Sequence, residues 1–273
     1  MTVGELADRG YRAPEPAPRR RHRTVWLLMI TAFVAAALGS AGTAYLMRPE
    51  PSGEWKSVFR EDFDTAVPVG DFPGTTYGAR FTTYPDGWAD TSGGGEYRPG
   101  EVLSVSDGSL NWDMRTEDGK ALGAAVLPTL PTYGQTYGQY SIRFRADPTP
   151  GFGMAFLLWP DSEKWPRDGE IDFPEGEFSE TVFGNAHRAD PGGAVDAFPT
   201  DARFDDWHVA TIAWRPSDVT FVLDGAVIGV STTDVPTRSM HWVLQTGSAG
   251  ATPASGSSTA RVQVDWIEAF ARQ

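Results

Sequence analysis

The 273-residue chain contains no cysteine. This absence excludes disulfide bonds and thiolate metal sites. Basic side chains are also scarce, because Lys and Arg number 23 against 36 Asp and Glu, with only 4 His. The resulting net charge of −13 argues against nucleic acid or an anionic lipid surface as a partner, since like charges repel. A domain of this chain must therefore be stabilised by its buried core.

Charge is missing altogether from residues 25–47, a run of 23 residues that would span a hydrocarbon layer of about 30 Å as a helix. The preceding residues 1–24 are polar and end in a basic cluster, which keeps this side cytoplasmic. Residues 25–47 therefore predict a single-pass transmembrane anchor, or a signal peptide cleaved near Ala41 or Ala44. Residues 48–53 are a linker. Either alternative predicts that residues 54–273 are extracellular or at the cell surface.

Residues 54–273 contain 16 basic and 32 acidic residues, a net charge of −16, and are long enough for one domain with a substantial core. Helical periodicity is almost absent from them, and short alternating segments predict β-strands instead. The predicted strands are residues 102–105, 109–114, 138–145, 154–159, 207–214, 219–223 and 261–270. The pair Asp224-Gly225 predicts a hairpin turn, and the small residues of 246–259 predict a loop. The pattern is typical of an all-β sandwich or jelly roll.

The segment Glu170-Ile171-Asp172-Phe173-Pro174-Glu175 places three carboxylates in one predicted strand. Side chains alternate along a strand, so Glu170 and Asp172 share a face and Glu175 would lie on the opposite one. A β-bulge at Phe173-Pro174 would return Glu175 to the face of Glu170, and proline is tolerated at bulges. The hexapeptide therefore predicts a bulged strand with three carboxylates in a row.

Such a row suits hydrolysis of a glycosidic bond, because crowding separates carboxyl pKa values into a proton donor and an ionised partner. Two carboxyls about 5–5.5 Å apart give a retaining double displacement, and Asp172 between them would orient one glutamate. A solvated acidic face and a calcium site are the alternatives to catalysis. Glu177, which would rejoin the same face after the bulge, is interpreted as an outer cleft or solvent residue.

The region around this hexapeptide resembles glycoside hydrolase family 16, whose catalytic strand has the form Glu-x-Asp-x-(x)-Glu. The lead-in Trp165-Pro166-Arg167-Asp168-Gly169 is similar to that of laminarinase-like members. Weaker similarities in the family's order run from Phe59-Arg60-Glu61-Asp62-Phe63-Asp64 to Val264-Asp265-Trp266. The resemblance implies a jelly roll of two curved antiparallel sheets, concanavalin-like, with an open cleft that admits internal segments of a polysaccharide. It also implies that Glu170 is the nucleophile, Asp172 its assistant and Glu175 the acid/base.

Further site residues follow from the resemblance. Trp165 and Trp159 would line the cleft, His187 would lie near the acid/base, and Gln245 would reach sugar hydroxyls. Asp265 matches a position that binds a structural calcium in some members, although an ordinary surface aspartate is the alternative. No cofactor is required for catalysis. Leu157 and Pro174 depart from the residues that are usual in the family, which affects the expected substrate more than the chemistry.

The sequence thus predicts an exported retaining endo-β-glycanase, with a β-1,3-glucan-type polysaccharide favoured as substrate. A transglycosylase acting on cell-envelope polysaccharide has the same site and stays open. So do a non-catalytic, lectin-like carbohydrate-binding jelly roll and a structural calcium-binding surface protein. The expected partners are the polysaccharide and, through an uncleaved N-terminal helix, the membrane. The protein is expected to be a monomer that does not bind nucleic acid.

Overall fold

The computed structural model describes residues 53–273. The predictions for the cytoplasmic tail 1–24, the anchor or signal peptide 25–47, and the linker up to residue 52 lie outside the described residues. Within residues 53–273, neither of the two helices has the length and apolar character needed to cross a membrane.

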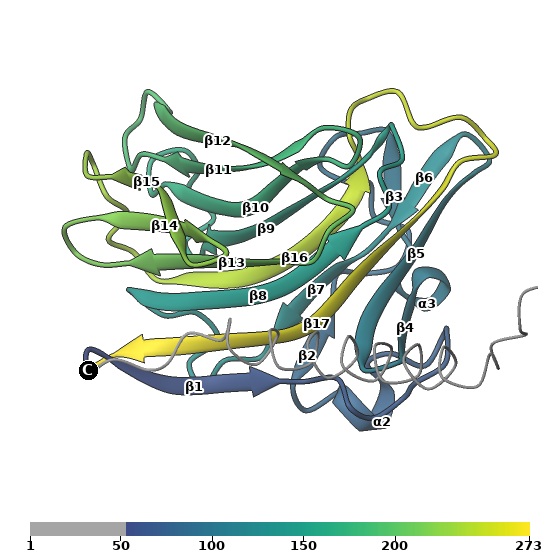
Figure 1. Cartoon of the computed structure of the whole chain (residues 1–273), viewed down its shortest axis with the longest axis horizontal. Helices are drawn as coiled ribbons and strands as arrows, with labels where there is room; N and C mark the ends of the chain where they lie inside the picture. The colour runs from purple at the N-terminus through teal and green to yellow at the C-terminus, as the bar shows by residue number, and fades with distance from the viewer. Residues whose placement is uncertain (1–52) are drawn as a thin grey trace, which may run out of the picture. The chain divides into compact units, whose positions relative to one another are not determined.

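The described chain folds into two β-sheets that pack face to face (Figure 1). In the seven-stranded sheet the order is β12 (Val195–Arg203), β11 (Thr181–His187), β10 (Glu170–Glu177), β9 (Phe152–Pro160), β16 (Met240–Ser248), β7 (Ala125–Pro128) and β2 (Phe81–Thr83). The ten-stranded sheet runs β15 (Ala226–Ser231), β14 (Val219–Leu223), β13 (His208–Trp214), β8 (Gly138–Ala146), β17 (Thr259–Arg272), β5 (Ser109–Glu117), β6 (Lys120–Gly123) and β3 (Gly95–Tyr97). In addition, β1 (Trp55–Glu61) pairs with β17, and β4 (Leu103–Ser106) pairs with β5. Two short helices, α2 (Gly74–Tyr77) and α3 (Pro99–Val102), complete the described part.

The predicted all-β sandwich is confirmed, with strands at each of the predicted places. The hairpin is confirmed as well: Asp224 and Gly225 have φ values of 50° and 81°, and a type I′ turn requires positive φ at both positions. Two expectations were wrong in detail. The strand β16 continues to Ser248, because Thr246 is fully buried and bonded to Ala124, so the predicted loop begins only at residue 249. Not every pair is antiparallel, since β3 and β6 run parallel.

The hydrophobic core lies between the sheets and is held by contacts across them. The Phe156 ring on β9 lies 6.0 Å from the Trp112 ring on β5, and the Trp242 ring on β16 lies 5.3 Å from that of Tyr140 on β8. All four side chains are buried. Burying one such side chain stabilises the fold by about 1.5–3 kcal/mol. Alternate residues of β9, β10 and β16 are used in this way, which leaves the others for the outer face of the seven-stranded sheet.

Candidate active site

The strand β10 carries the bulge that the hexapeptide predicts. Its residue Asp172 pairs with Leu157 of β9, and Glu175 pairs with Ala155 of the same strand. Three steps along β10 therefore correspond to two steps along β9. The same shift occurs on the other side, where the partners on β11 are Asn185 and Phe183. One extra residue is thus accommodated between Asp172 and Glu175, at Phe173-Pro174.

The bulge sorts the side chains of β10 onto two faces. Ile171 and Phe173 enter the core, where the Phe173 ring meets that of Phe221 on the opposite sheet at 5.6 Å. Glu170, Asp172 and Glu175 all line one cleft on the outer face. The predicted row of three carboxyl groups is therefore present in the structure.

The cleft has an apolar floor and aromatic walls. A small cluster separate from the main core supplies the floor, in which Leu157 of β9 and Val243 of β16 are buried. Trp159 lines the same cleft, as the shared face of residues 157 and 159 predicts. Tyr84 and Trp88, with ring centroids 5.9 Å apart, form a wall, and Trp88 is 56% exposed.

The structure separates the tryptophans of the core from those of the cleft. Trp112 and Trp242 are core residues, whereas Trp88 and Trp159 are available to stack on a sugar.

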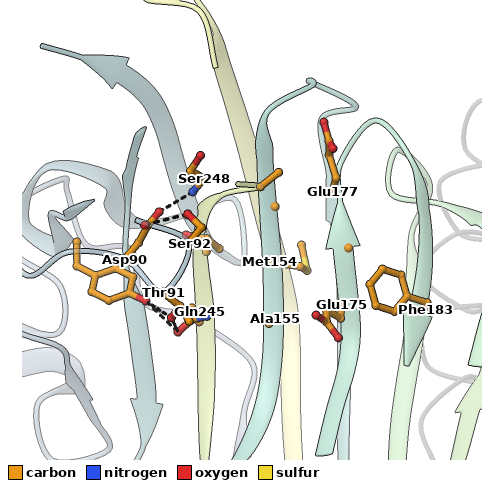
Figure 2. Close-up of a pocket in the computed structure, with 16 residues that line it drawn as sticks. Asp90, Thr91, Ser92, Met154, Ala155, Glu175, Glu177, Phe183, Gln245 and Ser248 are labelled. Atoms are coloured by element: carbon orange, nitrogen blue, oxygen red, sulfur yellow. Dashed lines mark hydrogen bonds between the residues drawn. The ribbon is translucent and has the colours of Figure 1, made fainter. Parts of the chain in front are cut away.

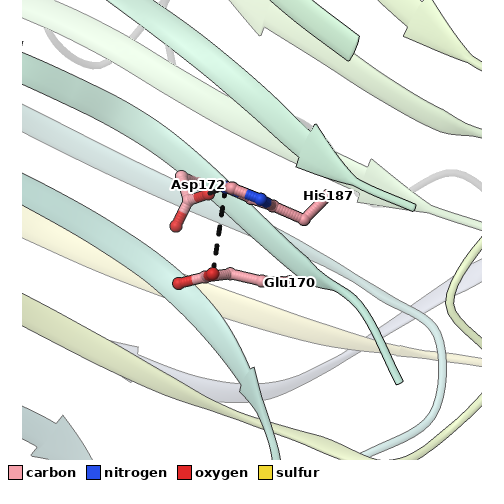
Figure 3. A group of neighbouring side chains, drawn as sticks. All are labelled: Glu170, Asp172 and His187. Carbon is pink, nitrogen blue, oxygen red and sulfur yellow. Dashed lines mark ion pairs between the residues drawn. The ribbon is translucent and has the colours of Figure 1, made fainter. Parts of the chain in front are cut away.

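Glu170, Asp172 and His187 all line the cleft. Their side chains lie close together (Figure 3). The His187 Nε2 atom on the neighbouring strand β11 lies 3.2 Å from Asp172 Oδ2 and 3.8 Å from Glu170 Oε2. Register explains this convergence, because His187 pairs directly with Glu170 in the ladder. One ligand atom from each of the three residues lies within 4.8 Å of the others, so the group could also hold a metal ion.

Burial changes the acidity of all three carboxyl groups. Desolvation, followed by the charge of Asp172, raises the pKa of Glu170 to about 9. Desolvation and the charge of Glu175 raise the pKa of Asp172 well above its ordinary value, because that side chain is almost fully buried. Desolvation also raises the pKa of Glu175. These carboxyl groups therefore hold their protons to higher pH than isolated Asp and Glu side chains do.

Asn185 gives Glu175 a hydrogen-bonding environment that differs from that of Glu170 and Asp172. Its Nδ2 donates a hydrogen bond of 2.7 Å to Glu175 Oε2, and this bond lowers the pKa of Glu175 against the effect of burial. An amide donor stabilises the ionised form of the carboxyl it contacts. Glu170 and Glu175 therefore lie in one row but in different hydrogen-bonding environments.

A second pocket, whose lining includes Asp90, Ser92 and Ser248, adjoins the cleft at Glu175 (Figure 2). Glu175 and Gln245 line both pockets. Glu177 stands beyond Glu175 on the same face, where it accepts hydrogen bonds from the Gly151 amide at 2.8 Å and from Ser179 at 3.1 Å. The expectation that Glu177 rejoins the face of Glu175 is confirmed, and its side chain also anchors the turn before β9.

Gln245 lies at the junction of the two pockets, in a fixed orientation. Its Oε1 accepts hydrogen bonds from Tyr97 Oη at 2.9 Å and from Thr91 Oγ1 at 3.0 Å. The side-chain NH₂ group is then left to donate toward a bound sugar.

The remaining predicted residues lie at the margins or elsewhere. Trp165 is 48% exposed and stands beside the cleft, with its ring 6.0 Å from that of His187. Asp265 lies on β17 in the other sheet, where its carboxylate accepts a hydrogen bond from Arg143 at 2.7 Å. In residues 53–273, Asp265 belongs to no group of three or more potential metal-ligating side chains. Calcium binding at Asp265 stays a prediction.

Several cleft residues were not identified from the sequence. Asn185 had a usable signal, because it lies two residues before His187 and so shares its face on the same strand. Tyr84, Thr91 and Tyr97 had none, because they reach the cleft from loops and short strands whose path depends on tertiary packing.

Crowded carboxyl groups with raised pKa values, in an open cleft with aromatic walls, define the kind of site that glycoside hydrolases use. Comparison with known proteins agrees with this class. The family model described as "Glycosyl hydrolases family 16" matches residues 103–268, more than half of the chain, and the chain belongs to this family.

Two curated relatives come from Rhizobium meliloti (strain 1021). The endo-1,3-1,4-beta-glycanase ExsH is 22% identical over 176 residues, which cover 62% of this chain and 38% of the relative. The endo-1,3-1,4-beta-glycanase EglC is 22% identical over 239 residues, which cover 78% of this chain and 51% of the relative. The chain thus spans about half or less of the length of these relatives.

Solved structures share the fold. The catalytic domain of an endo-1,3-beta-glucanase (laminarinase) from Thermotoga petrophila RKU-1 superposes with a TM-score of 0.64 at 21% identity, over 81% of this chain and 99% of that domain. The laminarinase from Rhodothermus marinus has a TM-score of 0.67 at 19% identity, over 80% and 98% of the two chains. The fold is therefore the jelly roll that the resemblance implied.

Proposed function

We propose that this protein is a retaining endo-β-glycanase that hydrolyses internal bonds of a polysaccharide, with β-1,3-glucan favoured. The observation that carries the proposal is the bulged strand β10, which presents Glu170, Asp172 and Glu175 together in an open cleft. The names of the two curated relatives, both endo-1,3-1,4-beta-glycanases, support an endo-acting glycanase.

In the proposed first step Glu170 attacks the anomeric carbon while Glu175 protonates the leaving oxygen. Glu175 then removes a proton from the water that hydrolyses the glycosyl–enzyme intermediate. Glu170 gives up its proton before it attacks, and we propose that Asp172, which is hydrogen-bonded to Glu170 and is the more deeply buried of the two, accepts that proton. Glu170 is then free to be ionised when substrate arrives.

Endo action is supported by the space on both sides of Glu175. The aromatic cleft lies on the Glu170 side, and the second pocket, with Asp90 and Ser248 in its lining, continues beyond Glu175. An acid/base that protonates the bond between two occupied stretches cleaves within a chain. Trp88 and Trp159 supply stacking surfaces, and Gln245 supplies a fixed donor.

The test is hydrolysis of a panel of β-glucans by the purified full chain, with reducing ends and product size measured and the anomeric configuration followed by NMR. The proposal expects oligosaccharides that are first released in the β configuration. The isosteric Glu170→Gln variant should lose at least 10³-fold in turnover while its circular dichroism spectrum is unchanged. Glycan binding without any release of reducing ends would favour the lectin-like alternative, and products longer than the substrate would favour transglycosylation.

We also propose that the domain is exported. Support comes from the basic cluster before residue 24 and from the uncharged residues 25–47. Protease added to intact producing cells should digest the catalytic domain of an anchored protein, and a signal-peptide protein should instead be found in the medium. Protection of the domain from protease in intact cells, with none in the medium, would contradict export.

A further inference from the structure

The lining of the cleft and of the second pocket that adjoins it contains acidic residues but, among the described residues, no lysine or arginine. The acidic lining residues are Asp90, Glu163, Glu170, Asp172, Glu175 and Glu177, and the lining residue that can carry a positive charge is His187. Three of these carboxyls belong to the proposed catalytic row. The other three lie along the path of the substrate, on both sides of it.

These three outer carboxylates are fixed by hydrogen bonds, and none of them forms an ion pair with a cationic side chain of residues 53–273. Glu163 accepts a bond of 2.8 Å from the Trp159 indole, which also orients that ring in the cleft. Asp90 accepts bonds from the Ser248 amide at 2.8 Å and from Ser92 at 3.0 Å. Glu177 is bonded in the same way to the Gly151 amide and to Ser179.

Three arginines lie within three residues, in the sequence, of a residue that lines the cleft or the second pocket. Each of them is already paired with a carboxylate outside that lining. Arg98 is bound by Glu96 at 2.6 Å, Arg167 by Asp168 at 2.7 Å, and Arg188 by Asp196 at 2.5 Å. Recognition of a carboxylate, sulfate or phosphate group normally uses such a guanidinium or a lysine. The cleft offers neither.

We propose that this cleft selects uncharged glycan chains and rejects chains that carry carboxylate, sulfate or phosphate groups. The proposal rests on the proposed function, and it makes Glu163 a specificity-determining residue. An anionic substituent would lose part of its hydration without gaining a cation and would be repelled by the carboxylates along the cleft. Glu163 applies this repulsion on the aromatic side of the cleft, and Asp90 and Glu177 apply it beyond Glu175.

The experiment compares kcat/KM of the full chain on three versions of one linear β-1,3-glucan: unmodified, carboxymethylated, and hydroxyethylated to the same low degree. The hydroxyethyl chain controls for bulk. We expect the carboxymethyl chain to be cleaved at least tenfold less efficiently than the hydroxyethyl chain at about 10 mM salt. The gap should narrow severalfold near 1 M salt, because the screening length falls from about 30 Å to about 3 Å.

The variant Glu163→Gln keeps an oxygen for the Trp159 indole and removes the charge. It should reduce the hydroxyethyl-to-carboxymethyl ratio at low salt by at least threefold. The matched control Asp206→Asn removes a charge from an exposed side chain that lines neither pocket, and should leave the ratio within a factor of about 1.5.

Equal rates on the two modified chains, or a gap that does not respond to salt, would overturn the charge selection while leaving the proposed function intact. Failure to cleave the unmodified glucan would instead count against the proposed substrate. In that case the binding of the three chains to Glu170→Gln, measured by calorimetry, still tests the inference: tighter binding of the carboxymethyl chain would refute it, and weaker binding would support it.

Discussion

The hydrogen bond from Asn185 to Glu175 makes a quantitative prediction about the pH dependence of activity. The Asn185→Ala variant removes the amide that donates a hydrogen bond to that carboxyl. Because the bond favours the ionised form, its loss raises the pKa of Glu175 further. Glu175 must be protonated for the first step, so the alkaline fall in kcat/KM should move to higher pH.

The size of the shift follows from the strength of the bond. A hydrogen bond to a charged group contributes about 1.5–3 kcal/mol, and one pKa unit corresponds to about 1.4 kcal/mol. Glu175 is partly exposed to solvent, which weakens the effect, so we expect a shift of about one unit. A second variant, Asn185→Asp, places a like charge beside Glu175 and should shift the limb further in the same direction.

The assay is kcat/KM against pH on a soluble β-1,3-glucan, which reports the ionisations of the free enzyme. Gln263→Ala, which removes an amide from the other sheet, is the control and should leave the profile unchanged. An alkaline limb that stays in place or moves to lower pH in folded Asn185→Ala would refute the assignment of Glu175 as the acid.

Three further predictions concern stability and binding. The pKa of Glu170 is raised to about 9, so the folded state binds more protons than the unfolded state between about pH 4.5 and 9. Burial of Glu170 therefore costs more stability as the pH rises through that window. Glu170→Gln should therefore raise the melting temperature at pH 8 more than at pH 4.5, and an equal gain at both would contradict the shift. Trp88→Ala should raise KM about threefold to tenfold, which corresponds to the loss of about 1 kcal/mol typical of one aromatic contact. Because Trp88 is exposed, the melting temperature should stay within about 2 °C of the wild-type value. An unchanged KM would show that Trp88 does not belong to the binding surface. Phe156→Ala should lower the free energy of unfolding, measured by urea denaturation, by about 3–5 kcal/mol. The control Val227→Ala changes an exposed side chain and should alter this free energy by less than about 0.5 kcal/mol. Similar values for the two variants would argue against the cross-sheet core.

The features that could be predicted from the sequence are those set by local rules. Alternation located the strands, Asp224-Gly225 located a hairpin, and the need to bring Glu175 onto the face of Glu170 located the bulge. Each depends on the geometry of a few neighbouring residues.

The features that escaped prediction depend on contacts between distant segments. The continuation of β16 through Thr246 is fixed by Ala124, and the parallel pairing of β3 with β6 is set by the path of the intervening chain. The hydrogen bonds that hold Gln245 come from Thr91 and Tyr97, about 150 residues away in the sequence. No local pattern carries this information.

The central claim, that Glu170 is the nucleophile of a row created by the bulge, can be tested by trapping the intermediate. A 2-deoxy-2-fluoro β-1,3-linked glucosyl disaccharide with an activated leaving group should form a glycosyl–enzyme that is hydrolysed slowly. Peptide mapping by mass spectrometry should then find the sugar on Glu170, with no label in Glu170→Gln. A label on Glu175, or release of the leaving group with no covalent adduct, would contradict the account.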